Sequence, residues 1–337
     1  MATASKLAVK EKVSGVILID KPIGMTSQQV VSKVKYLFKS PIHDSKKAGH
    51  TGTLDPMATG LLPICLGEAT KFSHYQLDAD KSYQATIWLG SQTDTGDADG
   101  QIVAQAAVPI FNSDLLQQIT QKFLGVQQQM PPMYSALKKD GKKLYEYARA
   151  GIEIERPLRD INIKALSLEL IDEQQIQLTV TCTKGTYVRV LGEDIAKSLG
   201  TLGHLTALRR TQVGKFHLSD VISIEQLEQQ DLSMRLAQLL PIDACLNISA
   251  TLILTAEQCE RIHMGQRLNV FEQLTPELNS YITANILVKL ASDIHALTPE
   301  DYELPIDIRL TDESDQFLGL GAISLNGRLQ PKKLIQR

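Results

Sequence analysis

One stretch of the chain, AGHTGTLDPMATGLLPICLGEATKF (48–72), gathers residue types that can do chemistry around a single carboxylate. Asp55 precedes Pro56, and the proline ring biases Asp55 away from the helical region of backbone space and fixes the chain direction beyond it. Gly49 and Gly52 permit backbone conformations and close ligand approaches that other residues do not. A carboxylate held in such a loop can act as a nucleophile or as a general base.

The same residues also fit a purely structural loop. Asp-Pro is a common way to start a turn, and a histidine beside glycine is more often a polar loop residue than a catalyst. Carboxylate chemistry on sugars usually needs two carboxylates at a fixed distance, and no second one stands out near Asp55. The H-E-x-x-H, G-x-S-x-G and P-loop patterns do not occur, which argues against the enzyme classes that they mark.

Composition places the chain among ordinary globular proteins. Of its 337 residues, 43% are apolar and 22% are charged. No apolar run approaches the ~20 residues needed to span a bilayer, and the N-terminus lacks the apolar core of a secretory signal. A cytoplasmic location is therefore expected. The four cysteines form no CxxC pair, so buried thiols are a better interpretation than a zinc site or a disulfide framework.

Charge is distributed unevenly along the chain. Residues 1–218 carry 26 Lys and Arg against 21 Asp and Glu, an excess of five positive charges. Residues 219–337 carry 9 against 17, an excess of eight negative charges. A polyanion would therefore be expected to bind the N-terminal two thirds.

The segments on either side of the Asp55 loop have the patterns of regular elements that could hold it. GVILID (15–20) predicts a short apolar strand that ends at a Lys-Pro turn. Thr26 is a good helix cap, and apolar residues then repeat on one face of a predicted helix over residues 28–39. LLPICLG (61–67) predicts a strand at the far end of the loop. Residues 40–60 have no such period and are predicted to be a functional loop.

The remaining segments mix strand and helix patterns without the regular alternation of a βαβ fold. Strands are predicted at 83–89, 161–171, 175–183 and 204–214, and helices at 68–75, 114–124, 186–200 and 223–240. Residues 251–337 are predicted to be short strands and turns. No G-x-G-x-x-G follows a strand, which argues against a Rossmann fold. The predicted fold class is α+β, with a mixed, largely antiparallel sheet flanked by helices.

The Asp55 loop resembles the catalytic motif of the TruB family of tRNA pseudouridine synthases, G-H-T-G-x-L-D-P-x-A-T-G, and residues 49–60 match it without departure. DKPIGMTS (20–27) is similar to the family's N-terminal motif. Further segments that match in order are KSYQATIWLGSQTDTGDADG (81–100), MPPMYSALKKDGKKLYEYARAGIE (130–153), KGTYVRVLGEDIAKSLG (184–200) and GHLTALRRTQVGKF (203–216). The resemblance covers about residues 14–216 and implies the pseudouridine synthase fold.

The resemblance implies an isomerase that converts uridine to pseudouridine at position 55 in the T-arm of tRNA. Asp55 matches the family's essential carboxylate. The reaction breaks the C1′–N1 bond, turns the uracil and forms a C1′–C5 bond, so it has no net redox change, and no cofactor or metal is expected. The carboxylate can add to a sugar or base carbon or remove a proton from the ribose, and all of these roles are compatible with the sequence.

The family's other site residues map onto five positions. Because the target uridine lies inside a folded arm, the enzyme must flip it out and replace its stacking. Tyr83 matches the tyrosine that stacks on the flipped base, and Tyr187 the tyrosine near the target base. Arg189 matches the arginine that holds the aspartate ionised and oriented. His50 matches a histidine that contacts the flipped-out region, and Leu208 an apolar residue that lines the uracil pocket.

The resemblance also suggests a domain plan. Residues 1–13 are expected to be a flexible tail and residues 14–245 the catalytic domain. Within it, residues 125–151 match a mobile insertion that clamps RNA, with phosphate contacts expected from Lys138, Lys139, Lys142 and Lys143. Residues 250–337 are expected to form a small PUA-like β domain, because the closing segment FLGLGAISLNGRLQPKKLIQR is similar to the end of such a domain.

Three other functions are alternatives. A nucleoside hydrolase or glycosidase usually needs two carboxylates at a fixed distance, and no second one stands out near Asp55. A non-catalytic RNA-binding or tRNA-folding protein on the same scaffold would not need a carboxylate paired with Arg189 and facing polyanionic RNA. A guide-RNA-dependent relative is disfavoured by the long insertion with Pro131 and Pro132, which looks like the stand-alone bacterial type. The expected partner is the T-arm stem-loop of tRNA, with no DNA and no membrane, and the family suggests a monomer.

Overall fold

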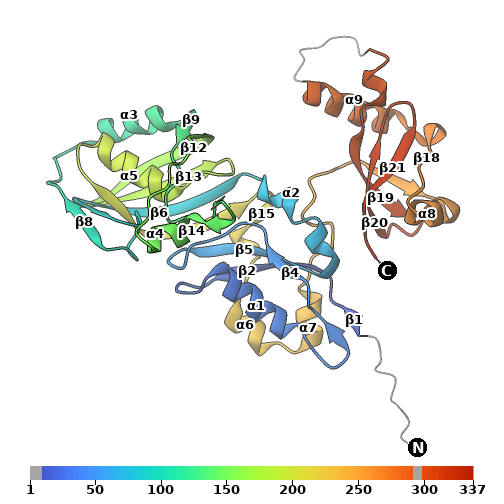
Figure 1. Ribbon diagram of the computed structural model, residues 1–337, viewed down its shortest axis with the longest axis horizontal. Helices are drawn as coiled ribbons and strands as arrows, with labels where there is room; N and C mark the ends of the chain where they lie inside the picture. The colour runs from blue at the N-terminus through green and yellow to red at the C-terminus, as the bar shows by residue number, and fades with distance from the viewer. Residues whose placement is uncertain (1–9, 291–297, 337) are drawn as a thin grey trace, which may run out of the picture. The chain divides into compact units, whose positions relative to one another are not determined.

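The computed structural model describes residues 10–290 and 298–336. The chain forms two compact units, Met1–Leu240 (unit 1) and Pro241–Arg337 (unit 2), which are coloured blue to yellow and orange to red in Figure 1. Residues 241–245, expected in the catalytic domain, belong to unit 2, where Asp243 pairs with Arg309. Among the described residues, no helix is long and apolar enough to cross a membrane.

Unit 1 is built on a ten-stranded sheet. Eight strands follow the order β16-β2-β5-β14-β6-β13-β12-β9, while β4 pairs with β5 and β15 with β14. Only β16–β2 and β14–β5 are parallel, so the predicted mixed, largely antiparallel sheet of an α+β fold is confirmed. The strands are β2 (Gly15–Lys21), β4 (Ala48–His50), β5 (Thr59–Leu66), β6 (Lys81–Leu89), β9 (Gly125–Gln129), β12 (Arg159–Asp172), β13 (Gln175–Cys182), β14 (Gly203–Val213), β15 (Phe216–His217) and β16 (Ile222–Ser223).

Helices pack on both halves of this sheet. Helix α5 contacts β14 and β6, α3 contacts β12, and α1 contacts β4 and β5. Helix α1 begins where the sequence predicts, because Thr26 and Gln29 form a capping box. The helices of unit 1 are α1 (Ser27–Leu37), α2 (His74–Leu77), α3 (Ser113–Phe123), α4 (Leu144–Arg149), α5 (Val188–Ser198), α6 (Ile224–Gln229) and α7 (Leu232–Ala237), with 3-10 turns at Gly67–Lys71 and Leu218–Asp220.

The two halves of the sheet meet at a short joint between β5 and β14. Their parallel pairing comprises two residue pairs, Arg209 with Thr59 and Arg210 with Gly60. Gly60 has φ +99°, and a Cβ added there would lie 2.3 Å from the Arg210 carbonyl oxygen. A glycine is therefore required for this close approach. The joint lies at the C-terminal end of the Asp55 loop, so it helps to position that loop.

Within unit 1, the predicted segments 40–60 and 223–240 differ from the structure. The loop predicted over 40–60 contains β3 (His43–Asp44) and β4, because β4 pairs with β5 and so satisfies its backbone without an apolar pattern. The single helix predicted over 223–240 is two helices, α6 and α7. Asp231 interrupts it by capping α7, since its side chain accepts a hydrogen bond from the Met234 amide.

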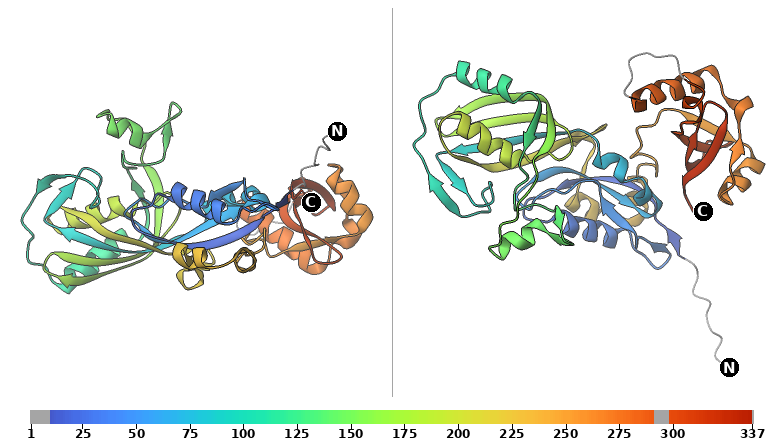
Figure 2. Two further views of the ribbon diagram at one scale, coloured as in Figure 1. Left: turned by 90° about the horizontal axis from the view of Figure 1, so that it is seen from below. Right: turned by 45° about the horizontal axis from the view of Figure 1, so that its top comes forward.

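Three small two-stranded sheets lie outside the main sheet of unit 1. Strand β1 (Glu11–Lys12) pairs with β3, and Val13 is buried, so the packed chain starts before residue 14. Residues 1–9 of the expected tail lie outside the described residues. The other pairs are β7 (Ser91–Thr93) with β8 (Ile102–Gln105), and β10 (Lys138–Lys139) with β11 (Lys142–Lys143). Figure 2 shows β10, β11 and α4 projecting together from the sheet.

Unit 2 has its own five-stranded sheet, in the order β17-β19-β20-β21-β18, and its own apolar core. A C-terminal β domain is thus confirmed. The prediction of strands and turns alone is wrong, since α8 (Ala256–His263) and the 15-residue α9 (Pro276–Leu290) pack on the sheet. Its other elements are β17 (Thr251–Leu254), β18 (Leu268–Asn269), β19 (Ile306–Asp312), β20 (Phe317–Ile323), β21 (Arg328–Leu334) and two 3-10 turns (Phe271–Gln273, Asp301–Glu303).

Candidate active site

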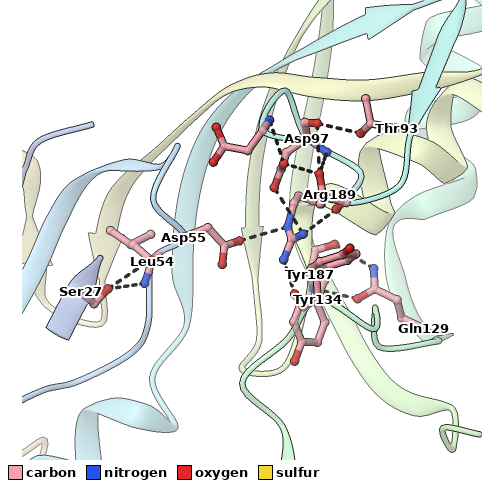
Figure 3. A network of polar contacts seen from close by, with 11 residues as sticks. Ser27, Leu54, Asp55, Thr93, Asp97, Gln129, Tyr134, Tyr187 and Arg189 are labelled. Carbon is pink, nitrogen blue, oxygen red and sulfur yellow. Dashed lines mark hydrogen bonds and ion pairs between the residues drawn. The ribbon is translucent and has the colours of Figure 1, made fainter. Parts of the chain in front are cut away.

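Asp55 lies on the loop that joins β4 to β5, and the loop is fixed on both sides of it. The Ser27 hydroxyl, at the start of α1, donates to the Leu54 carbonyl over 2.9 Å and accepts from the Leu54 amide over 2.8 Å. Beyond Asp55, the Gly24 amide donates to the Pro56 carbonyl over 2.8 Å. These bonds, drawn in part in Figure 3, hold the backbone on either side of the carboxylate.

The Asp55 carboxylate forms an ion pair with Arg189 from the first turn of α5. The distance from Arg189 Nε to Asp55 Oδ2 is 3.1 Å. The two side chains differ in exposure, with 5% of the arginine side chain and 37% of the aspartate side chain accessible. The guanidinium thus supports the carboxylate from inside the protein, and a face of the carboxylate stays open to a ligand.

Arg189 is held by three further groups, which fixes the direction in which its guanidinium faces Asp55. Its Nη1 donates to the Thr95 carbonyl over 2.6 Å and lies 3.3 Å from Asp97 Oδ2. Its Nη2 donates to the Tyr134 carbonyl over 2.7 Å. Asp97 is itself buried and accepts from the Thr95 hydroxyl over 2.6 Å. Figure 3 shows this network converging on Arg189.

Opposing effects set the proton affinity of Asp55. Burial raises the pKa of its carboxyl above the ordinary value. The positive charges of Arg189 and Lys21 counteract this rise in pKa, while the negative charges of Asp97 and Asp99 add to it. A partly desolvated carboxylate with a raised pKa is a stronger base than one in water, and the arginine keeps it oriented. The arrangement suits a general base or a nucleophile.

Tyr187 is the residue immediately before α5, and its backbone is hydrogen-bonded to the side chain of Gln129 at the end of β9. The Tyr187 amide donates to Gln129 Oε1 over 2.8 Å, and Gln129 Nε2 donates to the Tyr187 carbonyl over 3.2 Å. Gln129 is buried, and both the oxygen and the nitrogen of its side-chain amide form hydrogen bonds to Tyr187. These bonds connect the start of α5, which carries Arg189, to β9, the strand that precedes β10, β11 and α4.

Tyr83 lies on β6 and Leu208 on the neighbouring strand β14, opposite Arg210 and Ala85 respectively, and both are buried in the main core of unit 1 with Leu54. Burial raises the pKa of the Tyr83 phenol, and the positive charge of Arg210 counteracts this rise. His50, at the end of β4, accepts from the Gly52 amide through Nδ1 over 3.3 Å. Burial lowers the pKa of its imidazole, and the nearby Arg210 lowers it further.

The structure therefore brings Asp55, Arg189 and Tyr187 to one place, where they interact electrostatically. The negative charge of Asp55 also contributes to the raised pKa of the Tyr83 phenol. His50 and Leu208 belong to the surrounding loop and core and are not in hydrogen-bonding contact with the carboxylate. Among the described residues, no cluster of His, Cys, Asp and Glu has the arrangement of a metal site.

Sequence reasoning missed four residues that support this site: Lys21, Asp97, Gln129 and Arg210. Lys21, at the end of β2, is fully buried, and its Nζ donates to the carbonyls of Pro22 and Pro56 over 2.8 and 3.3 Å. Burial lowers the pKa of its amine to about 8, although the charge of Asp55 acts in the opposite direction. Each of the four lies inside or beside a segment that matches a family motif. That position is the sequence feature that could have marked these residues as part of the site.

Family models match most of the chain. The N-terminal domain of the TruB family of pseudouridylate synthases matches residues 40–188. The C-terminal domain of tRNA pseudouridylate synthase B matches residues 189–247, and a further TruB C-terminal model matches residues 301–335.

Curated proteins resemble the chain over nearly its full length. A tRNA pseudouridine synthase B from Psychrobacter cryohalolentis is 70% identical, with 97% of this chain and 95% of the relative covered. A protein of the same name from Methylobacillus flagellatus is 43% identical, with 98% and 97% covered.

Solved structures share the fold at low sequence identity. A chain from a Cbf5-Nop10-Gar1 complex aligns with TM-score 0.59 and 21% identity, covering 96% of this chain and 84% of that one. An archaeal box H/ACA Nop10-Cbf5 complex gives 0.60 and 18%, covering 96% and 86%. At these identities the likeness concerns the fold alone, whereas the family models and the close relatives agree over most of the sequence. The chain belongs to the TruB family of pseudouridylate synthases.

Proposed function

We propose that this chain converts uridine to pseudouridine at position 55 in the T-arm of tRNA, with Asp55 as the catalytic carboxylate. Two kinds of observation support the proposal: relatives of up to 70% identity carry the name tRNA pseudouridine synthase B, and the family's motif is intact around Asp55. The observation that carries the catalytic assignment is the partly open Asp55 carboxylate paired with the buried Arg189 guanidinium.

The chemistry makes clear demands on such a site. The C1′–N1 bond breaks, the uracil turns, C5 bonds to C1′, and the C5 proton is lost while N1 gains one. Asp55 can add to a carbon of the sugar or base, or remove a ribose proton, and each role needs it ionised. The Arg189 charge favours that ionised form, while partial burial keeps the carboxylate reactive.

The target base must leave the tRNA stack to reach Asp55. We assign Tyr83 to stacking on the flipped base and Tyr187 to contact with it. Both lie close enough to Asp55 for its negative charge to contribute to the raised pKa of each phenol. Leu208 would contribute an apolar wall beside Tyr83. His50 would contact the flipped-out region from the loop. The T-arm would be recognised by its shape and its splayed bases.

The decisive experiment incubates the purified protein with an unmodified tRNA transcript and maps pseudouridine by carbodiimide labelling and primer extension. A new stop at nucleotide 55 of the T-arm is expected with the wild-type protein and not with Asp55→Asn. If tRNA binds but no pseudouridine forms, the chain is instead an RNA-binding or tRNA-folding protein on the same scaffold. The same preparation, passed through size-exclusion chromatography with light scattering, is expected to be a monomer.

The elements β10, β11 and α4, which follow Gln129 and project from the sheet, are proposed to contact RNA phosphates. Lys138 and Lys139 are exposed at their hairpin, whereas Lys143 and Arg149 lie over the Tyr145 ring at 5.3 Å each. The tyrosine thus holds two cations in place, and the hairpin exposes the amines of Lys138 and Lys139, of which Lys139 also donates to the Glu155 carbonyl over 3.4 Å. Basic side chains arranged in this way suit a phosphate backbone.

The double variant Lys138→Ala/Lys139→Ala is expected to weaken tRNA binding and to lower its salt dependence. Each lost phosphate contact reduces the slope of log K against log salt by about 0.7–0.9, so a reduction of roughly one to two is predicted. Filter binding between 50 and 200 mM salt measures the slope. Lys122→Ala/Lys197→Ala, which removes two exposed lysines from α3 and α5, is the matched control; equal slopes for the two variants would contradict the assignment.

A further inference from the structure

Arg210 is a buried arginine at the joint between the two halves of the sheet. Only 1% of the Arg210 surface is exposed to solvent. In the sheet it lies across from Gly60 on β5 and across from Tyr83 on β6. It forms no ion pair with a carboxylate among the described residues, unlike Arg189 and Arg209, which face Asp55 and Asp20. A buried guanidinium without a carboxylate is costly, so its hydrogen bonds must account for its presence.

Those hydrogen bonds reach both ends of the Asp55 loop. Nε donates to the Leu61 carbonyl over 2.8 Å, and Nη2 donates to the Gly52 carbonyl over 3.1 Å. Tyr83 lies directly across from Arg210 in the sheet, and the two groups affect each other's pKa. Gly52 lies three residues before Asp55 and Leu61 lies six residues after it, so one rigid planar group joins the two ends of the loop.

The backbone alone connects the loop to β14 weakly. Only two residue pairs link β5 and β14, and both belong to the end of the loop that leads into β5. The Gly52 end has no backbone pairing with β14, so its connection to that strand comes from the Arg210 side chain. Without that guanidinium, the position of Gly52 relative to Tyr83 would depend on the pairing of β4 with β5 and on the two residue pairs between β5 and β14.

We propose that Arg210 is a positioning residue that sets the Asp55 loop and the Tyr83 phenol in one fixed geometry for reaction. The inference rests on the proposed function, since it assumes that Asp55 and Tyr83 act on the target uridine. Arg210 is too deeply buried to touch RNA itself. Its effect therefore falls on the chemical step rather than on tRNA affinity, because the RNA-facing surface keeps its charges.

The test compares Arg210→Lys with Arg235→Lys in the full chain. Lysine keeps the positive charge but has a single nitrogen, which cannot replace Nε and Nη2 as they donate to the Leu61 and Gly52 carbonyls in fixed directions. Arg235 is the matched control, since its guanidinium also donates to backbone carbonyls, those of Leu227, Leu37 and Glu228, and none belongs to the Asp55 loop. The readouts are tRNA Kd, Tm and the single-turnover rate of tritium release from tRNA labelled at C5 of uridine.

For Arg210→Lys we expect a rate loss of about 10²-fold, the size expected when a reacting group is misplaced by about 1 Å, with Kd unchanged. Arg235→Lys should keep the wild-type rate. A wild-type rate in Arg210→Lys, or an equal rate loss in both variants with an equal fall in Tm, overturns the proposal. An inactive wild-type protein instead refutes the proposed function, which separates the two failures.

A double-mutant cycle with Tyr83→Phe distinguishes positioning from general stability. Tyr83→Phe keeps the ring and removes the hydroxyl whose pKa Arg210 affects from across the sheet, so the cost of Arg210→Lys in rate should be smaller in the Tyr83→Phe background than in wild type. Additive losses contradict a shared role. If Arg210→Lys does not fold, Tyr83→Phe alone remains informative: a reduced rate with unchanged Kd supports the shared role, and an unchanged rate overturns it.

Discussion

Asp55→Asn is expected to lower the rate of pseudouridine formation by on the order of 10⁴-fold or more, the scale seen when a reacting side chain is removed. Asparagine has nearly the shape of aspartate but can neither accept a proton nor add to carbon as a carboxylate does. The fold should be retained, since the loop is held by Ser27 and by Pro56 backbone contacts that do not involve the carboxylate. tRNA affinity should be retained or rise, because a negative charge facing RNA is removed.

Tritium release under single-turnover conditions measures the rate, and filter binding measures the affinity. Asp243→Asn is the matched control, because Asp243 also pairs with an arginine, Arg309, but belongs to unit 2. The control should keep the wild-type rate. A near-normal rate for Asp55→Asn would show that Asp55 is not the catalytic carboxylate and that another group performs the reaction.

Arg189→Met is expected to produce the second largest effect, on both rate and stability. It leaves Asp55 without its cation, Asp97 as a buried unpaired carboxylate, and the carbonyls of Thr95 and Tyr134 without donors. Breaking one side of a buried ion pair costs about 3–5 kcal/mol of folding free energy. A rate loss of about 10²–10³-fold is expected, as for removal of a preorganised electrostatic partner.

The same variant should shift the pH dependence in a defined direction. Burial already raises the Asp55 pKa, and the Arg189 charge counteracts the rise. Without Arg189 the pKa of Asp55 rises further, so the carboxylate protonates sooner as pH falls, and the acid limb of the rate profile moves to higher pH. Single-turnover rates from acid to neutral pH measure the shift, and urea unfolding measures the stability.

Arg189→Lys provides the control for charge. It keeps a cation near Asp55 but lacks the planar group that serves four acceptors, so its acid limb should stay closer to wild type than that of Arg189→Met. A profile for Arg189→Met with an acid limb at lower pH than wild type would mean that the acid limb does not report Asp55 ionisation.

Local patterns in the sequence determined much of this protein. The Asp-Pro pair between glycines located the Asp55 loop, Thr26 and Gln29 located the start of α1, and alternation located β6. Each of these signals acts over a few residues, so it can be read before the fold is known. Helix α9 was missed because residues 251–337 were expected to form only short strands and turns, and packing in unit 2 buries one side of this helix.

Only the tertiary structure decided how the site is held together. Arg210 reaches the Gly52 carbonyl across 158 residues, Gln129 reaches Tyr187 across 58, and Arg189 reaches the Thr95 carbonyl across 94. The acceptors for Arg210 and Arg189 in these bonds are backbone carbonyls, which every residue possesses, so no residue type in the sequence marks them. The motif therefore specifies which groups are present, and long-range strand pairing and helix packing determine which of them meet.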